Sequence, residues 1–226
     1  MAAAGGTPMS RRSTVILLAA GAVVVGVGIG LGVGLGTRSS AQQRLPVRSI
    51  TDRTLSAARL QAQAVWPAKT RRAPGFLLRD QHQRLFPLQS QRGHVVFLTF
   101  LNSYCKQACP LEGRQLAQIQ RMFPHAFRPT LIVVSVNPRG DTITSTNSAA
   151  RRWRFATPWY WLRGQKLQLE RIWRTYNIEV QPKQGDIAHG TAVYVLDRHG
   201  YERAGYEFPF STPGVATAVR ALERSD

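Results

Sequence analysis

Cysteine is scarce in this chain of 226 residues, which contains only two, Cys105 and Cys109. A disulfide between residues four apart closes too small a loop to stabilise a domain, so a disulfide-stapled scaffold is excluded. Chemistry explains the pair better, because two neighbouring thiols in a polar turn can exchange with a disulfide or hold a soft metal ion. Two buried structural thiols that happen to be neighbours are the alternative.

Acidic residues are also few, with 12 Asp and Glu against 30 Lys and Arg and a formal net charge of +18. Such an excess is typical of proteins that contact nucleic acids or anionic membranes. The arginines are scattered, however, and even the densest points, 71–72 and 151–154, match no nucleic-acid-binding motif. We therefore expect no nucleic-acid partner and a basic surface that faces an anionic membrane.

One long apolar run, residues 15–36, contains 22 residues without a polar side chain. At about 1.5 Å per residue it spans the roughly 30 Å hydrocarbon core of a bilayer, and it exceeds the apolar region of a signal peptide. Arg11 and Arg12 precede the run, which favours a cytoplasmic segment 1–14 and an extracytoplasmic remainder. We expect a single-pass anchor in a bacterial cell membrane, with cleavage near Ala41 as the alternative.

Beyond this run, residues 37–72 are polar and arginine-rich and are interpreted as a tether, with an amphipathic helical pattern over 54–66. The compact domain follows over residues 73–226, and about 150 residues are enough to bury a full core. The pattern predicts strands at 76–79, 94–101, 130–136, 191–196 and 201–206, and helices at 110–122, 145–152, 165–176 and 213–223. Alternating strands and helices, followed by a hairpin and a helix, predict an α/β fold with a mixed sheet.

The two cysteines lie at the junction between the predicted strand 94–101 and the predicted helix 110–122. A helix N-terminus stabilises a thiolate, and open α/β sheets place their sites at such strand ends. His189 precedes the strand 191–196 and is expected to face the cysteines if both strands belong to one sheet. Two thiolates and an imidazole suit Cu(I), or zinc with a fourth ligand. The other histidines are interpreted as surface or capping residues: His82, His94, His125 and His199.

Four motifs follow one another from residue 74 onward. They are P-x-F-x-L-x-D-Q at 74–81, C-x-x-x-C-P at 105–110, S-V-N-P-x-x-D-T at 135–142, and a histidine before a strand, His189. Gly93 and an apolar strand follow the first motif. In this order, behind one apolar span, the motifs resemble the Sco/SenC family of membrane-tethered, thioredoxin-like proteins.

The resemblance implies a thioredoxin-like fold and a copper site formed by Cys105, Cys109 and His189. The implied function is a copper metallochaperone that binds Cu(I), with Cu(II) as a second state, for assembly of a cytochrome c oxidase copper site. The implied partner is the copper-binding subunit of that oxidase or another copper or thiol protein. Between the cysteines, Lys106 stands where the family often carries an acidic residue, and its charge favours a thiolate but opposes cation binding.

Other functions stay open at this point. In a thiol–disulfide oxidoreductase, Cys105 would attack a partner disulfide and Cys109 would resolve the mixed disulfide, which would make the protein an enzyme. A metallochaperone is not an enzyme in the strict sense, and only the metal site needs His189. A redox-inert assembly scaffold is a third alternative. Peroxidase chemistry is disfavoured, because Leu101 stands where a peroxidatic site has Thr or Ser.

Overall fold

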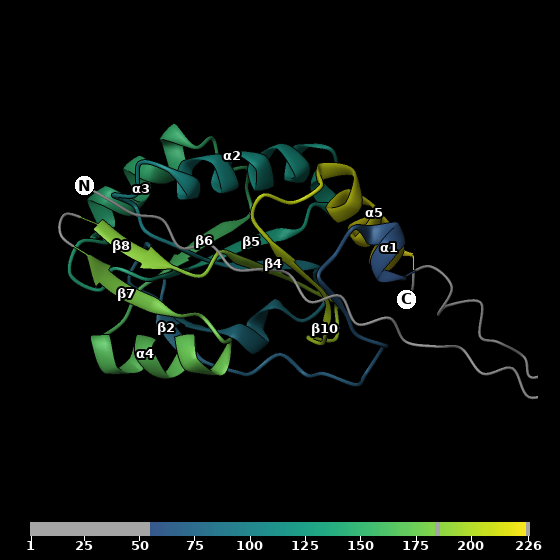
Figure 1. Ribbon diagram of the computed structural model, residues 1–226, viewed down its shortest axis with the longest axis horizontal. Helices are drawn as coiled ribbons and strands as arrows, with labels where there is room; N and C mark the ends of the chain where they lie inside the picture. The colour runs from purple at the N-terminus through teal and green to yellow at the C-terminus, as the bar shows by residue number, and fades with distance from the viewer. Residues whose placement is uncertain (1–54, 184–185, 225–226) are drawn as a thin grey trace, which may run out of the picture. The chain divides into compact units, whose positions relative to one another are not determined.

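The computed structural model describes residues 55–183 and 186–224, which form one compact unit (Figure 1). The expected anchor at 15–36 and its cytoplasmic flank lie outside the described residues. Among the residues that are described, no helix is long and apolar enough to cross a membrane.

The described residues form an α/β domain. The strands are β1 (Ala64–Val65), β2 (Leu77–Arg79), β3 (Leu85–Pro87), β4 (Val96–Leu101), β5 (Thr130–Ser135), β6 (Trp159–Leu162), β7 (Val180–Lys183), β8 (Asp186–His189), β9 (Ala192–Leu196) and β10 (Glu202–Glu207). The helices are α1 (Ala57–Leu60), α2 (Ala108–Arg121), α3 (Ile143–Arg152), α4 (Lys166–Thr175) and α5 (Thr212–Glu223), with short 3-10 helices η2 (Leu88–Gln91) and η3 (His125–Phe127).

Six strands form one mixed sheet in the order β1-β10-β9-β4-β5-β6. Strands β4, β5 and β6 run parallel, whereas β9 pairs antiparallel with β4 and with β10. All six residues of β4 and of β5 are buried. Apolar and β-branched runs are typical of strands covered on both faces, which explains why these two lie inside the sheet and not at its edges. The prediction of an α/β fold with a mixed sheet is confirmed.

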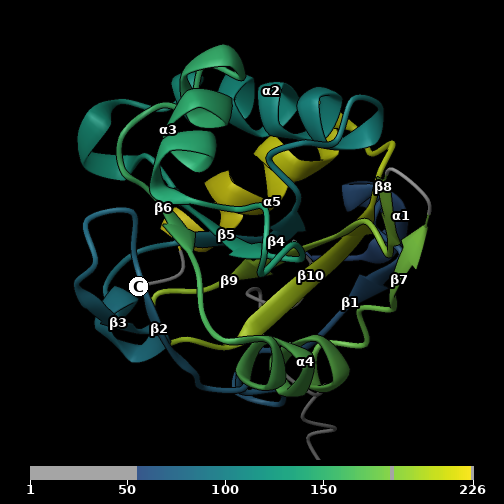
Figure 2. The same ribbon diagram turned by 90° about the vertical axis from the view of Figure 1, so that its left-hand side faces the viewer.

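Each face of the sheet has its own core. On one face, Phe97 and Leu101 of β4 pack with α2 and α5, and on the other Leu98 and Phe100 pack with α4 and the β2–β3 hairpin. Figures 1 and 2 show α2, α3 and α5 on one side of the sheet and α4 on the opposite side. The period-2 alternation of strand side chains divides the residues of β4 between the two cores.

The described part of the segment interpreted as a tether, residues 55–72, contributes to this domain. Strand β1 pairs with β10, and α1 lies against α5, where Leu60 is fully buried. A Cβ added at Gly214 in α5 would lie 2.1 Å from the Leu60 carbonyl oxygen, so the close approach of the two helices needs glycine. The helical pattern over 54–66 is realised only as the four residues of α1, because the chain then turns to join the sheet.

Two predicted features lie in small hairpins outside the main sheet. The predicted strand 76–79 forms β2, which pairs with β3 in a separate two-stranded sheet. His189 is the last residue of β8, which pairs with β7 in another hairpin, and two residues separate it from the start of β9. Strand β6, at the edge of the main sheet, was not predicted. These elements have only three or four residues each, which is too short for a period to identify them.

Candidate metal centre

A tight turn carries the chain from the end of β4 to the start of α2. The backbone N–H of Cys105 donates to the Asn102 carbonyl at 3.1 Å, and the Tyr104 N–H donates to the Asn102 side-chain oxygen at 3.0 Å. Both bonds fold the chain back on itself immediately after Leu101. The turn therefore delivers Cys105 to the N-terminus of α2, where Cys109 is the second helical residue.

The two cysteines differ in exposure and are not joined by a disulfide. Cys105 is half-buried, whereas Cys109 is fully buried. The Cys109 backbone N–H donates to the Cys105 sulfur at 3.5 Å, so an N–H of the helix N-terminus supports negative charge on Cys105. The hydrogen bond to Cys105 and burial both raise the pKa of the Cys109 thiol. The first thiolate of the pair is thus expected on the outer sulfur.

The third predicted residue, His189, reaches Cys109. Its Nε2 lies 3.3 Å from the Cys109 sulfur, and its Nδ1 lies 3.0 Å from the Gly190 carbonyl oxygen. Because a carbonyl oxygen only accepts, Nδ1 carries the proton in the neutral ring, and the Nε2 lone pair faces Cys109. Metal-binding histidines are oriented in this way, with the distal N–H donated to a carbonyl or carboxylate.

Cys109 is the centre of the three donors, since it contacts both Cys105 and His189. Within residues 55–183 and 186–224, however, no three His, Cys, Asp or Glu side chains are already clustered as ligands of one ion. Two sulfurs and an imidazole nitrogen suit a soft ion such as Cu(I). The donor set therefore fits copper, and binding would require Cys105 and His189 to close around the ion.

Asp141 fixes the cysteine turn from the neighbouring loop after β5. Its Oδ1 accepts the Ser103 N–H at 2.9 Å, and its Oδ2 accepts the Ser135 hydroxyl at 2.6 Å. Asp141 is only 4% exposed, and burial raises its pKa against the opposing effect of these hydrogen bonds. The S-V-N-P-x-x-D-T motif thus ties the end of β5 to the residues that position Cys105.

Glu112 lies beneath the cysteines on the buried face of α2 and was not predicted as a site residue. The Thr99 hydroxyl donates to Glu112 Oε1 and also lies 3.0 Å from the Ala192 carbonyl oxygen. Its single proton therefore serves two acceptors. Burial raises the pKa of Glu112 to about 8, against the opposing effect of the hydrogen bond from Thr99 and with a smaller contribution from Cys105.

We expect this carboxyl to make stability depend on pH between its usual pKa of 4.5 and about 8. In that range the unfolded chain has lost the proton that the folded protein keeps, so stability falls as pH rises, by at most about 1.4 kcal/mol per pH unit. Glu112→Gln keeps a neutral donor. In urea unfolding of both full-length proteins from pH 5 to 8, the parent should lose stability relative to the variant as pH rises. A constant difference would contradict a neutral Glu112.

Glu112 had a signal in the sequence. Cys109, Glu112, Leu116 and Ile119 fall on one face of the helix, and all are buried. A lone carboxyl among the apolar positions of a helix is seldom buried without a role, and it lies next to a cysteine motif.

Together, the fold and the site define a thioredoxin-like α/β protein with a dithiol at a strand–helix junction and a histidine supplied by a separate hairpin. The sequence model of the SCO1/SenC family matches residues 67–222, and the chain belongs to this family. No curated protein sequence matches the chain.

Solved structures share the fold. ScoI of Bradyrhizobium japonicum with copper bound is 22% identical, with a TM-score of 0.57, and the match covers 66% of this chain and 98% of that one. A SCO1/SenC family lipoprotein from Bacillus anthracis is 20% identical, with a TM-score of 0.62 and coverage of 71% and 100%. BsSco, a member of the Sco family of cytochrome c oxidase assembly proteins, is 17% identical, with a TM-score of 0.62 and coverage of 73% and 100%.

Proposed function

We propose that this protein is a copper metallochaperone that holds Cu(I) through Cys105, Cys109 and His189 and passes it to a cytochrome c oxidase copper site. The observation that carries the proposal is the orientation of His189, whose Nε2 lone pair faces the Cys109 sulfur while Nδ1 is tied to a carbonyl. A dithiol reductant has no need of a histidine in this position. The copper-bound ScoI structure supports the choice of ion.

Delivery follows from the difference between the two thiols. The buried Cys109 and the oriented His189 would hold the ion from inside, whereas the half-buried Cys105 is the ligand that a partner can reach. Exchange of one accessible ligand at a time lets copper move without being released to water. The proposed recipient is the copper-binding subunit of the oxidase, in keeping with the assembly role stated for the family of BsSco.

We further propose that residues 15–36 anchor the protein as a single span, with the described domain on the extracytoplasmic side of a bacterial cell membrane. The length of the apolar run and the preceding Arg11 and Arg12 support this arrangement. The anchor would keep the copper site near a membrane-embedded partner.

A second function, thiol–disulfide exchange, is supported by the contact between the Cys109 N–H and the Cys105 sulfur. A sulfur at a helix N-terminus and partly accessible is suited to attack a disulfide, and a buried neighbour is suited to resolve the product. The structure of BsSco was described as identifying a disulfide switch in that protein. Both activities are compatible, because copper binding requires the reduced thiols.

The test is an anaerobic Cu(I) titration of the full-length, reduced protein against a chromogenic Cu(I) chelator. We expect one tightly bound Cu(I) per chain. The same protein oxidised to the Cys105–Cys109 disulfide is the matched control and should leave all copper with the chelator. Failure of the reduced protein to compete for copper would overturn the chaperone proposal and leave the reductant.

A further inference from the structure

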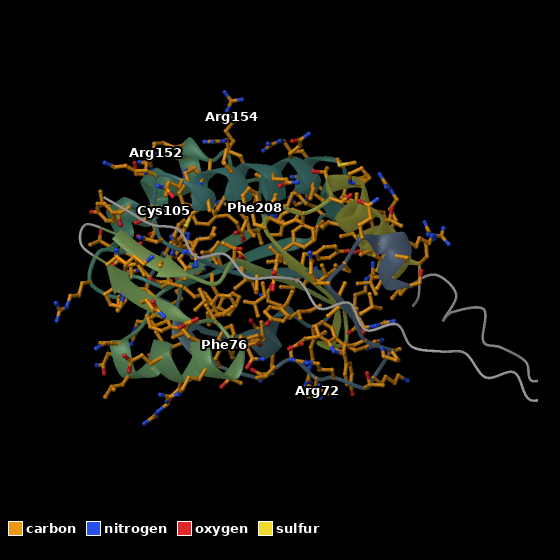
Figure 3. All side chains as sticks on the ribbon, in the orientation of Figure 1. Arg72, Phe76, Cys105, Arg152, Arg154 and Phe208 are labelled. Carbon is orange, nitrogen blue, oxygen red and sulfur yellow. The ribbon has the colours of Figure 1, made fainter. Side chains whose placement is uncertain are left out.

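A groove of about 570 Å³ opens beside Cys105 between the start of α2 and helix α3. Three cationic side chains line it, Lys106, Arg114 and Arg152, and none of its lining residues, all of them in the described part of the chain, is acidic. Figure 3 shows Cys105 and Arg152 at the same end of the domain. The groove therefore presents uncompensated positive charge next to the accessible thiol.

Two other basic hollows of the described surface are different. The hollow that contains Arg79 and Arg163 also contains Asp141, and the one beside Arg72 also contains Asp197. The groove beside Cys105 thus differs from these other basic hollows, because no acidic residue in its lining offsets its positive charge. Because the groove contains the Cys105 thiol, the molecule that binds in the groove is expected to be the same molecule that reacts with Cys105.

The groove is built to hold this charge in place. Arg152 donates to the Ser148 hydroxyl at 2.7 Å and to the Ser103 carbonyl at 3.4 Å, which fixes its guanidinium over the cysteine turn. Hydroxyl groups from the first turns of α3 and the exposed aromatic side chain of Tyr104 complete the wall. The N-terminus of the ten-residue helix α3 adds a partial positive charge.

We propose that this groove binds an acidic polypeptide segment of the protein with which Cys105 exchanges copper or a disulfide. The inference rests on the proposed function and adds the chemistry of the partner. A polypeptide suits the groove better than a lipid headgroup, because the groove combines hydroxyls and an aromatic wall with the charges and includes the reactive thiol. Opposite charge on the partner would raise the rate of productive encounter.

The experiment uses a neutral-detergent solution of the full-length protein and two cysteine peptides, one acidic and one neutral, each joined to thionitrobenzoate by a disulfide. The Cys105 thiolate attacks the peptide sulfur, a Cys105–peptide disulfide forms, and thionitrobenzoate leaves with the electron pair and is measured by its absorbance. The readout is the ratio of the two rates. Intrinsic thiol reactivity and the integrity of the fold affect both rates equally and cancel from the ratio.

We expect the acidic peptide to react at least about tenfold faster at low ionic strength, with the preference lost in 0.5 M salt. Arg114→Gln and Arg152→Gln should each lower the ratio about threefold. Arg171→Gln is the matched control, since it removes the same charge from an exposed position on α4, across the sheet. Its ratio should equal that of the parent.

A rate ratio near one in the parent would overturn the proposal. A fall of the ratio in Arg171→Gln equal to that in the groove variants would also overturn it, by showing that only net charge matters. A ratio near one together with slower Cys105 reaction when phosphatidylglycerol is added to the micelles would overturn it in favour of a membrane surface. Cu(I) titration of the same variants separates this inference from the proposed function. Copper affinity should be unchanged in Arg114→Gln. If the parent protein binds no copper, that result counts against the proposed chaperone function and not against the binding role of the groove.

Discussion

His189→Ala is expected to lower the affinity for Cu(I) by more than about 100-fold, since changing only the groups behind a metal ligand costs about 10- to 100-fold. In the parent, the Nε2 lone pair lies 3.3 Å from the Cys109 sulfur, within the short adjustment that a shared ion would need. Alanine leaves two thiolates, which bind copper without a third protein ligand. The measurement is competition with a chromogenic chelator, carried out on the full-length, reduced protein.

His82→Ala is the matched control, because His82 is exposed in the turn of the β2–β3 hairpin, which packs on the face of the sheet opposite to Cys109. Its copper affinity should match that of the parent. The rate at which Cys105 reacts with a small disulfide should change little in His189→Ala, since the helix N-terminus still supports the thiolate. Unchanged copper affinity in His189→Ala would sink the three-ligand site, and a large loss of thiol reactivity would indicate that His189 serves exchange instead.

The middle of the sheet and the cysteine junction were predictable because long elements carry strong patterns. The predicted strands 94–101 and 130–136 are rich in apolar and β-branched residues, and they contain β4 and β5, which are buried, parallel neighbours in the structure. The helix after Cys109 keeps a 3.6-residue period over its full length, and Pro110 suits its first turn. Local sequence was sufficient to place the two thiols at a strand–helix junction.

The position of His189 depended on tertiary structure that the sequence does not express locally. Strands β7 and β8 pair only with each other among the described strands, and their four residues carry no clear alternation. The sequence therefore indicated a histidine before a strand, whereas the contact with Cys109 depends on how the hairpin lies over the end of the sheet. The raised pKa of Glu112 was equally hidden, because it depends on the burial of this carboxyl in the folded domain.

Asp141→Ala is expected to destabilise the folded protein by about 3 kcal/mol, because it leaves two buried donors, the Ser103 N–H and the Ser135 hydroxyl, without their acceptor. Asp141→Asn is the matched control. Its amide oxygen can still accept the Ser103 N–H and its NH₂ group can donate to the Ser135 oxygen, so the expected loss is about 1 kcal/mol. Urea unfolding of the full-length proteins at one pH gives both values.

The same pair of variants separates a structural tie from a charge effect at the copper site. If Asp141 acts by holding the cysteine turn, copper affinity should fall in Asp141→Ala and be largely kept in Asp141→Asn. Only the alanine variant loses the hydrogen bond to the Ser103 N–H, which holds the turn that positions Cys105. If its negative charge assists the cation directly, both variants should lose affinity alike, because both remove the charge. Both carboxylate oxygens of Asp141 are already engaged as acceptors, one of the Ser103 N–H and the other of the Ser135 hydroxyl, which is why we expect the first pattern. Equal losses of stability in the two variants would contradict the proposed structural role of the Asp141 hydrogen bonds.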